Sequence, residues 1–131
     1  MAYAIIYTLP GVPCLYYGDE IGMQGYRDPF NRRYFPWGSE DESLQSFYRA
    51  LSTLKKTLPA LRRGDVTVVE AGGGRLLFLR RTQEQTLCVC CNKSNAPWEL
   101  PLRGEVLLGC DLSYYPGKLT LGPDGCCLVT R

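Results

Sequence analysis

Charged and aromatic side chains alternate along residues 21–38, an irregular stretch rich in Gly, Pro and Arg. Asp28 and Arg32 supply a carboxylate and a guanidinium, and each is a fork that can hydrogen-bond two neighbouring hydroxyl groups. Flat apolar faces come from five aromatic residues: Tyr26, Phe30, Tyr34, Phe35 and Trp37. Charged forks combined with flat faces suit recognition of a pyranose ring. Asp28 and Arg32 could instead form only an ion pair that stabilises the loop, because structural ion pairs are common.

Other reactive side chains do not form a catalytic or metal pattern. Asp19 and Glu20 are adjacent, and adjacent residues rarely converge on one bond, so we expect them to act as scaffold groups. The chain has no histidine, so neither a metal site nor a cofactor is predicted. The cysteines include the adjacent pairs Cys90-Cys91 and Cys126-Cys127, whose side chains would point to opposite faces of a strand. This pattern predicts buried free thiols, which are typical of a reducing, cytoplasmic compartment.

The composition excludes two classes of partner. Apolar residues make up 45% of the 131 residues and the net charge is +2, so a packed core is expected. The basic residues are spread along the chain, and no nucleic-acid surface is predicted. Residues 2–17 are largely apolar, but Pro10, Gly11 and Pro13 interrupt them and no basic segment precedes them. This segment is therefore neither a signal peptide nor a membrane span.

The first half of the chain predicts helix, strand, loop and helix in turn. Residues 2–9 indicate the end of a buried helix, and the apolar run 14–17 is typical of a buried parallel strand. A second helix is predicted to begin at Ser39, because Ser39 and Glu42 match the capping-box pattern. Its apolar residues recur at helical spacing on one face: Leu44, Phe47, Tyr48, Leu51, Leu54 and Leu58.

The second half of the chain predicts a small β-domain. Strands are expected at 66–70, 75–81, 86–91, 105–110 and 126–130, with shorter ones at 98–100 and 118–121. Short strands separated by Gly, Pro and Asn turns favour an antiparallel sandwich. The strand, loop and helix that precede it form one βα unit, which cannot bury its own faces. Such a unit needs the neighbours of a parallel sheet or of a (β/α)8 barrel.

Two continuous motifs resemble glycoside hydrolase family 13, the α-amylase family. Residues 9–23 are similar to the last barrel strand of the family, with a Pro-Gly-x-Pro turn, a hydrophobic strand and Tyr-Tyr-Gly-Asp-Glu. Residues 28–37 are similar to the Asp-Pro-x-x-Arg-Arg-x-x-x-Trp stretch of the neopullulanase, cyclomaltodextrinase and maltogenic amylase branch. The helix from Ser39 resembles the final barrel helix. More loosely, Arg80, Asn92 and residues 119–128 follow the pattern of the C-terminal domain.

The resemblance implies an α+β fold: the last βα unit of a (β/α)8 TIM barrel, followed by an antiparallel β-sandwich. Residues 1–64 would be the C-terminal remnant of the barrel catalytic domain, with the end of helix 7, strand 8, the rim loop and helix 8. Residues 65–131 would be the C-terminal domain. The catalytic Asp, Glu and Asp of the family come from barrel strands four, five and seven. We therefore expect no catalytic residue in this chain, and we expect Met1 to mark the boundary of a fragment.

The resemblance also implies a function. In related enzymes the first Asp and first Arg of the 28–37 motif contact glucose units, which places substrate contacts at Asp28 and Arg32. We expect the C-terminal part of a glycosidase that acts on α-glucans or maltooligosaccharides, not competent for catalysis alone. The alternatives are a non-catalytic structural or interaction member of the same fold, and a carbohydrate-binding β-module. The apolar faces of 14–17 and of the second helix are expected to be covered by self-association, or by folding of the helix onto the sandwich.

Overall fold

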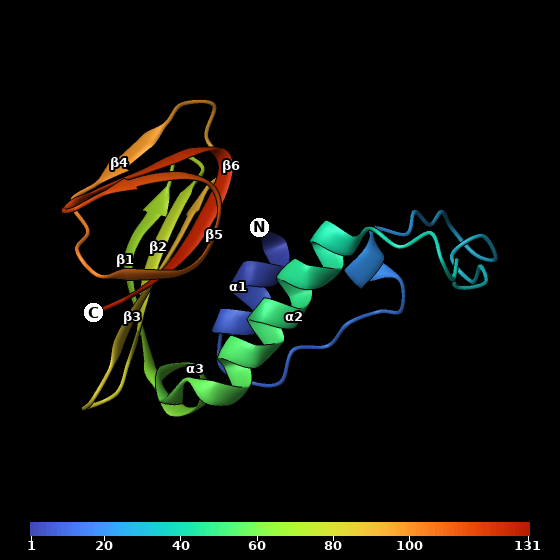
Figure 1. Cartoon of the computed structure of the whole chain (residues 1–131), viewed down its shortest axis with the longest axis horizontal. Coiled ribbons are helices and arrows are strands. Elements are labelled where there is room, and N and C mark those ends of the chain that lie inside the picture. Colours follow the sequence, from blue (N-terminus) through green and yellow to red (C-terminus); the bar gives the residue numbers. More distant parts are fainter.

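A layer of helices packs against one face of an antiparallel β-sheet, and a long loop projects away from both (Figure 1). The computed structural model describes all residues from 1 to 131. The helices are α1 (Ala2–Thr8), the 3-10 helix η1 (Asp19–Ile21), α2 (Glu42–Thr57) and α3 (Pro59–Arg63). The strands are β1 (Asp65–Gly72), β2 (Arg75–Arg81), β3 (Thr86–Asn92), β4 (Trp98–Leu100), β5 (Glu105–Tyr115) and β6 (Lys118–Thr130).

The start of α2 corrects the predicted capping box. Asp41 is the N-cap, and its carboxylate accepts hydrogen bonds from the Leu44 amide at 2.9 Å and from the Ser43 hydroxyl at 2.8 Å. Ser39 lies in the preceding turn, where its amide donates to the Pro36 carbonyl at 3.0 Å. Aspartate is as good an N-cap as serine, so Asp41 can take the position predicted for Ser39. The basic residues Lys55 and Lys56 lie in the last turn, where their positive charges interact favourably with the negative end of the helix dipole.

Residues 14–17 do not form the predicted parallel strand. They lie in an irregular segment between α1 and η1, and the backbone of residues 10–15 makes no hydrogen bond. Leu15, Tyr16 and Tyr17 are 37%, 54% and 43% exposed. A parallel strand exists only through bonds to its neighbours, and every strand pairing in this chain is antiparallel. The prediction is therefore wrong for this chain, because the chain supplies no partner strand.

The six strands form one continuous sheet in which β6 is central. The second half of β6 lies between β3 and β5, and its first half lies between β4 and β5. Residues 122–125 of β6 form a bend without ladder partners, and β5 shifts register opposite it. At Gly122 an added Cβ would lie 2.0 Å from the Asp111 carboxylate, so a larger residue there would displace the Asp111 side chain. The predicted sandwich is thus a single folded sheet, and the strands predicted at 118–121 and 126–130 are one strand.

The middle of the sheet is buried on both faces. In β3, Cys88 and Cys90 point to the concave side of the bent sheet, where they pack with Trp98, Leu119 and Leu121. The alternate residues of β3 face the helices, and they contact this group: Ala4, Tyr7, Tyr48, Leu51, Ala60 and Leu61. This two-sided burial explains the continuous apolar run of β3, which a sheet with one solvated face would not show. It also confirms that the adjacent cysteines lie on opposite faces as free thiols.

A buried arginine joins the helices to the sheet. The Arg80 side chain in β2 is 1% exposed and has no carboxylate partner. Its guanidinium donates to the Gly64 carbonyl at 2.7 and 3.2 Å and to the Thr8 carbonyl at the end of α1. Burial lowers the pKa of Arg80 below its ordinary value. Fixed carbonyl dipoles thus replace water around the charge and hold α1 and the α3–β1 junction against β2.

Candidate functional site

The projecting loop, residues 22–41, is anchored at its base by a short turn. Gly18 adopts a φ of +92°, and a side chain there would meet the Met23 sulfur at 2.7 Å. The Tyr17 hydroxyl donates to the Arg33 carbonyl at 3.0 Å, which ties the returning half of the loop to the segment before η1. These contacts fix the base of the loop, while the tip extends away from the rest of the molecule (Figure 1).

The adjacent carboxylates at this base make structural contacts. Asp19 accepts a hydrogen bond from the Tyr3 hydroxyl in α1, and this bond raises the pKa of Tyr3 to about 12. The Glu20 carboxylate accepts from the Gly18 amide at 2.9 Å, within its own turn. Each side chain therefore holds a different piece of backbone or helix, and the two do not converge on a common point as a catalytic pair must.

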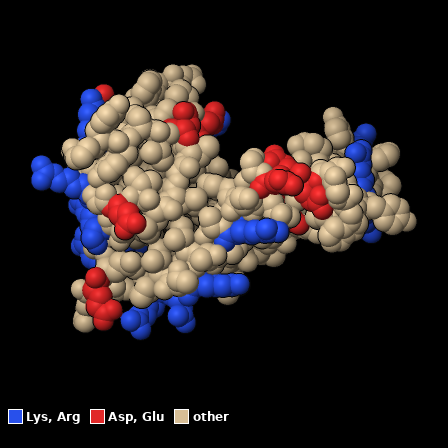
Figure 2. Space-filling model, viewed as in Figure 1, with Lys and Arg blue, Asp and Glu red and all other residues tan.

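Asp28 and Arg32 form an ion pair within the loop. The Arg32 Nε atom is 2.9 Å from the Asp28 Oδ1 atom, and the two side chains are 71% and 60% exposed respectively. An exposed pair of this kind contributes roughly 0–1 kcal/mol to stability. Because both side chains are mostly exposed, the remaining N–H groups of Arg32 and the second oxygen of Asp28 are accessible to a ligand. Acidic side chains gather where the loop meets α2, and basic ones gather toward the tip (Figure 2).

The same loop carries exposed aromatic rings. Tyr26, Tyr34 and Trp37 are 80%, 99% and 83% exposed, values that are unusual for large apolar side chains. The Phe35 and Trp37 rings pack against each other with centroids 4.5 Å apart. The loop therefore exposes both flat aromatic faces and a charged pair. The β-domain offers no comparable platform, because Trp98 is buried and Tyr115 is its one exposed large aromatic residue.

A cavity of about 300 Å³ lies at the base of the loop. Aromatic rings and short polar groups line it, among them Tyr16, Tyr17, Tyr26, Gln24 and Asn31. The Asn31 Oδ1 atom is buried and has no hydrogen-bond partner. A buried acceptor without a partner is unfavourable by about 1–3 kcal/mol, so this atom is a ready acceptor for a ligand hydroxyl. Sequence reasoning missed Asn31, since nothing in its local pattern signals an orphaned acceptor.

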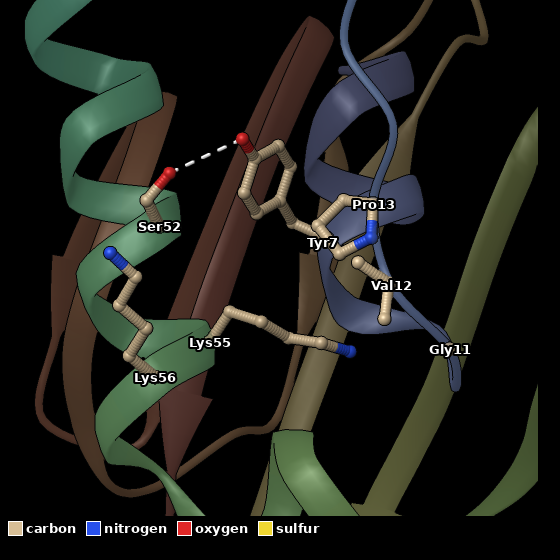
Figure 3. Close-up of a pocket in the computed structure, with 7 residues that line it drawn as sticks. All are labelled: Tyr7, Gly11, Val12, Pro13, Ser52, Lys55 and Lys56. Atoms are coloured by element: carbon tan, nitrogen blue, oxygen red, sulfur yellow. Dashed lines mark hydrogen bonds between the residues drawn. The ribbon is translucent and has the colours of Figure 1, made fainter.

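A second groove, of about 270 Å³, separates the segment after α1 from α2 (Figure 3). The Ser52 hydroxyl donates to the Tyr7 hydroxyl at 3.2 Å across its floor. Lys55 is already engaged, because its ammonium donates to the carbonyls of Leu9 at 2.7 Å and Leu61 at 3.1 Å. Burial, with a smaller contribution from Arg80, lowers the pKa of Lys55. These polar groups hold α1 and α3 against α2, and they are not free for a substrate.

No helix has the length and apolar character needed to cross a membrane. No group of three or more His, Cys, Asp or Glu side chains is arranged to hold a metal ion.

Comparisons with known proteins place this fold and loop in a family. No family model matches the chain. A cyclomaltodextrinase from Geobacillus thermopakistaniensis is 37% identical over 99 residues, and an amylopullulanase from Thermoanaerobacter thermohydrosulfuricus is 44% identical over 72 residues. Among solved structures, an α-amylase from Anoxybacillus covers 98% of the chain with a TM-score of 0.83 and 29% identity. A debranching enzyme from Nostoc punctiforme also covers 98%, with a TM-score of 0.82 and 30% identity.

The chain belongs to the α-amylase family of glycoside hydrolases. The resemblance found in its motifs, including the cyclomaltodextrinase and maltogenic amylase branch, is confirmed. The match covers 72% of this chain but 17% of the cyclomaltodextrinase, and 55% of this chain but 5% of the amylopullulanase. Within the α-amylase family the chain therefore corresponds to a C-terminal part, and its β-sheet matches the C-terminal domain.

Proposed function

We propose that this chain supplies the substrate-contacting rim loop and the C-terminal domain of a glycosidase that acts on α-glucans or maltooligosaccharides. Asp28 and Arg32 contact the sugar, and the bond is cleaved by carboxylates from another part of the enzyme. The observation that carries the proposal is the exposed Asp28–Arg32 pair in a loop that also exposes the aromatic rings of Tyr26, Tyr34 and Trp37. A glycosidase of this type needs two carboxyl groups about 5 Å apart across the bond, whereas in this loop Asp28 is paired with Arg32 and Asp41 caps α2.

The geometry of the pair supports binding over a purely structural role. Both side chains are mostly exposed, so replacing water by sugar hydroxyls carries a small desolvation cost. A carboxylate that already faces a guanidinium can accept from one hydroxyl while the guanidinium donates to the next. The exposed Tyr26 and Trp37 rings offer flat apolar faces of the kind against which a pyranose ring packs. The cavity with the Asn31 acceptor at the base of the loop extends this surface toward η1.

The unpaired segment before η1 supports a role for residues 1–64 in a parallel barrel. Residues 10–15 have no backbone hydrogen bonds, and Leu15 and Tyr16 expose apolar surface beside them. Free amides and carbonyls next to apolar side chains are the properties of a strand that lacks its neighbours. We infer that residues 14–17 become the last barrel strand in the whole enzyme, with α2 as the last helix. Residues 65–131 form the separate β-domain beside it.

A chimera tests the function. This chain would replace the segment that it matches in the cyclomaltodextrinase of Geobacillus thermopakistaniensis, and hydrolysis of maltooligosaccharides and cyclodextrins would be measured. We expect an active enzyme in which Arg32→Ala lowers kcat/KM about 10- to 100-fold, because a hydrogen bond to a charged group contributes about 1.5–3 kcal/mol. Arg27→Ala is the matched control, since Arg27 lies in the same loop without an ion pair. Equal kcat/KM for the two variants would refute substrate binding by Arg32.

Localisation rests on the thiols. All seven cysteines are free, and five of them are buried. Free thiols persist in reducing compartments, which supports a cytoplasmic location for the enzyme.

The proposed partner is an α-glucan or maltooligosaccharide. Self-association through the exposed segment before η1 stays a prediction for the isolated chain. The helix stripe is already covered within the chain, since Tyr48 and Leu51 are 6% and 1% exposed.

A further inference from the structure

Three cysteines lie in one row across three neighbouring strands. Cys126 in β6 is directly opposite Cys91 in β3 and also directly opposite Cys110 in β5. Directly opposite residues of antiparallel strands point to the same face, with Cα atoms about 4.5–5.5 Å apart. Cys91 and Cys126 belong to the cluster beneath α1 and α2, and Leu108, two residues before Cys110, packs against that cluster. The row therefore lies on the helix-facing side of the sheet.

The row runs from the interior to the surface. Cys91 and Cys126 are each 2% exposed, whereas Cys110 is an exposed free thiol. Burial raises the pKa of Cys126, and the nearby N-terminal ammonium of Met1 partly opposes that rise. An accessible thiol beside a buried one is the arrangement in which the first is oxidised and the second resolves the product.

The backbone at this point is compatible with a cross-strand disulfide. Disulfide-bonded cysteines have Cα atoms about 4.4–6.8 Å apart, a range that includes directly opposite strand residues. Strand β5 shifts register just after Cys110, and Asp111 has a φ of +49°. This bulge interrupts the ladder on one side of Cys110, so small adjustments there disturb few backbone bonds.

We propose that Cys110 and Cys126 form a peroxide-sensitive dithiol. The Cys110 thiolate attacks hydrogen peroxide, so that an S–O bond forms, the O–O bond breaks and hydroxide leaves to become water. The Cys126 sulfur then attacks the resulting sulfenic acid. The S–S bond forms, the S–O bond breaks, and the thiol proton leaves with the hydroxyl group as a second water. The two sulfur atoms together lose two electrons, and a dithiol reductant restores them.

Peptide mapping of the full chain tests the proposal. Trypsin separates the two residues, because Cys110 lies in peptide 104–118 and Cys126 lies in peptide 119–131. After treatment with hydrogen peroxide and alkylation of the remaining thiols, we expect the two peptides to be linked. Their joint mass should be lower by two hydrogen atoms, and dithiothreitol should release them. Cys110→Ser should abolish the link, and Cys14→Ser, at the other exposed cysteine, should leave it intact.

Variants of the adjacent cysteines assign the second partner. Cys127→Ala should keep the link and Cys126→Ala should remove it, with circular dichroism used to check that each variant folds. A link that survives in Cys126→Ala would overturn the proposal in favour of Cys127. Oxidation of Cys110 to sulfinic acid without a link would also overturn it. A link found only in covalent dimers would show that the reacting thiols belong to two molecules, and it would equally refute the proposed pair.

Discussion

Replacing Arg80 by Met should loosen α1 from the sheet while leaving the sheet folded. Met keeps much of the aliphatic stem but removes the three N–H donors to the Thr8 and Gly64 carbonyls. Both acceptor residues are buried, so the variant leaves two buried carbonyls without partners. Each orphaned carbonyl costs about 1–3 kcal/mol, and removal of a desolvated charge offsets part of that cost.

The net expectation is a loss of about 2–4 kcal/mol in the free energy of unfolding. In urea this loss should lower the unfolding midpoint by about 1–2 M, given the usual dependence of stability on denaturant. Hydrogen exchange should place the effect in space, because amides of α1 should lose protection well before amides of β3.

Arg81→Met is the matched control, since Arg81 is the next residue on β2 and its side chain is exposed. The control should leave the urea midpoint nearly unchanged. Equal midpoints for Arg80→Met and Arg81→Met would refute the idea that buried hydrogen bonds from Arg80 hold the helices. Exchange that increases equally in α1 and β3 would refute the idea that the effect is local.

Two further predictions concern local contacts. Asp41→Ala should reduce the helicity and thermal stability of α2, whereas Ser39→Ala should leave both unchanged in thermal melts followed by circular dichroism. A larger loss in Ser39→Ala than in Asp41→Ala would show that Ser39 is the N-cap after all. Hydrogen bonds from the Leu44 amide and the Ser43 hydroxyl lower the pKa of Asp41. The stability that this cap adds is therefore fully present above the unfolded pKa of about 4, and it is lost as the pH falls through the lower folded pKa. Asn92→Ala should destabilise the sheet by about 1–3 kcal/mol, because the Asn92 amide donates to the carbonyls of Ala96, Leu121 and Gly122. Asn95→Ala in the same turn is its control, and equal unfolding midpoints would contradict the assignment.

Local patterns were sufficient for the family and for most of the strands. The motif at 9–23 and the motif at 28–37 are long and specific enough to identify the α-amylase family without coordinates. Strand β2 matches its predicted bounds, since its turn signals and its run of apolar residues are local properties. The charged and aromatic residues of the 21–38 loop were also recognisable in the sequence, and the structure added that they are exposed. Whether Asp28 and Arg32 contact a substrate stays a prediction.

Features that depend on distant neighbours could be decided only by the tertiary structure. Residues 14–17 carry a strand pattern, but a strand needs partners that this chain does not supply. The bond between Arg80 and Thr8 joins residues that are 72 positions apart, and the row of Cys91, Cys126 and Cys110 exists only through strand register. The sequence of a segment determines its local preference for helix, strand or turn. Packing decides which buried groups meet, because hydrogen bonds, thiol pairs and sheet edges are properties of two segments at once.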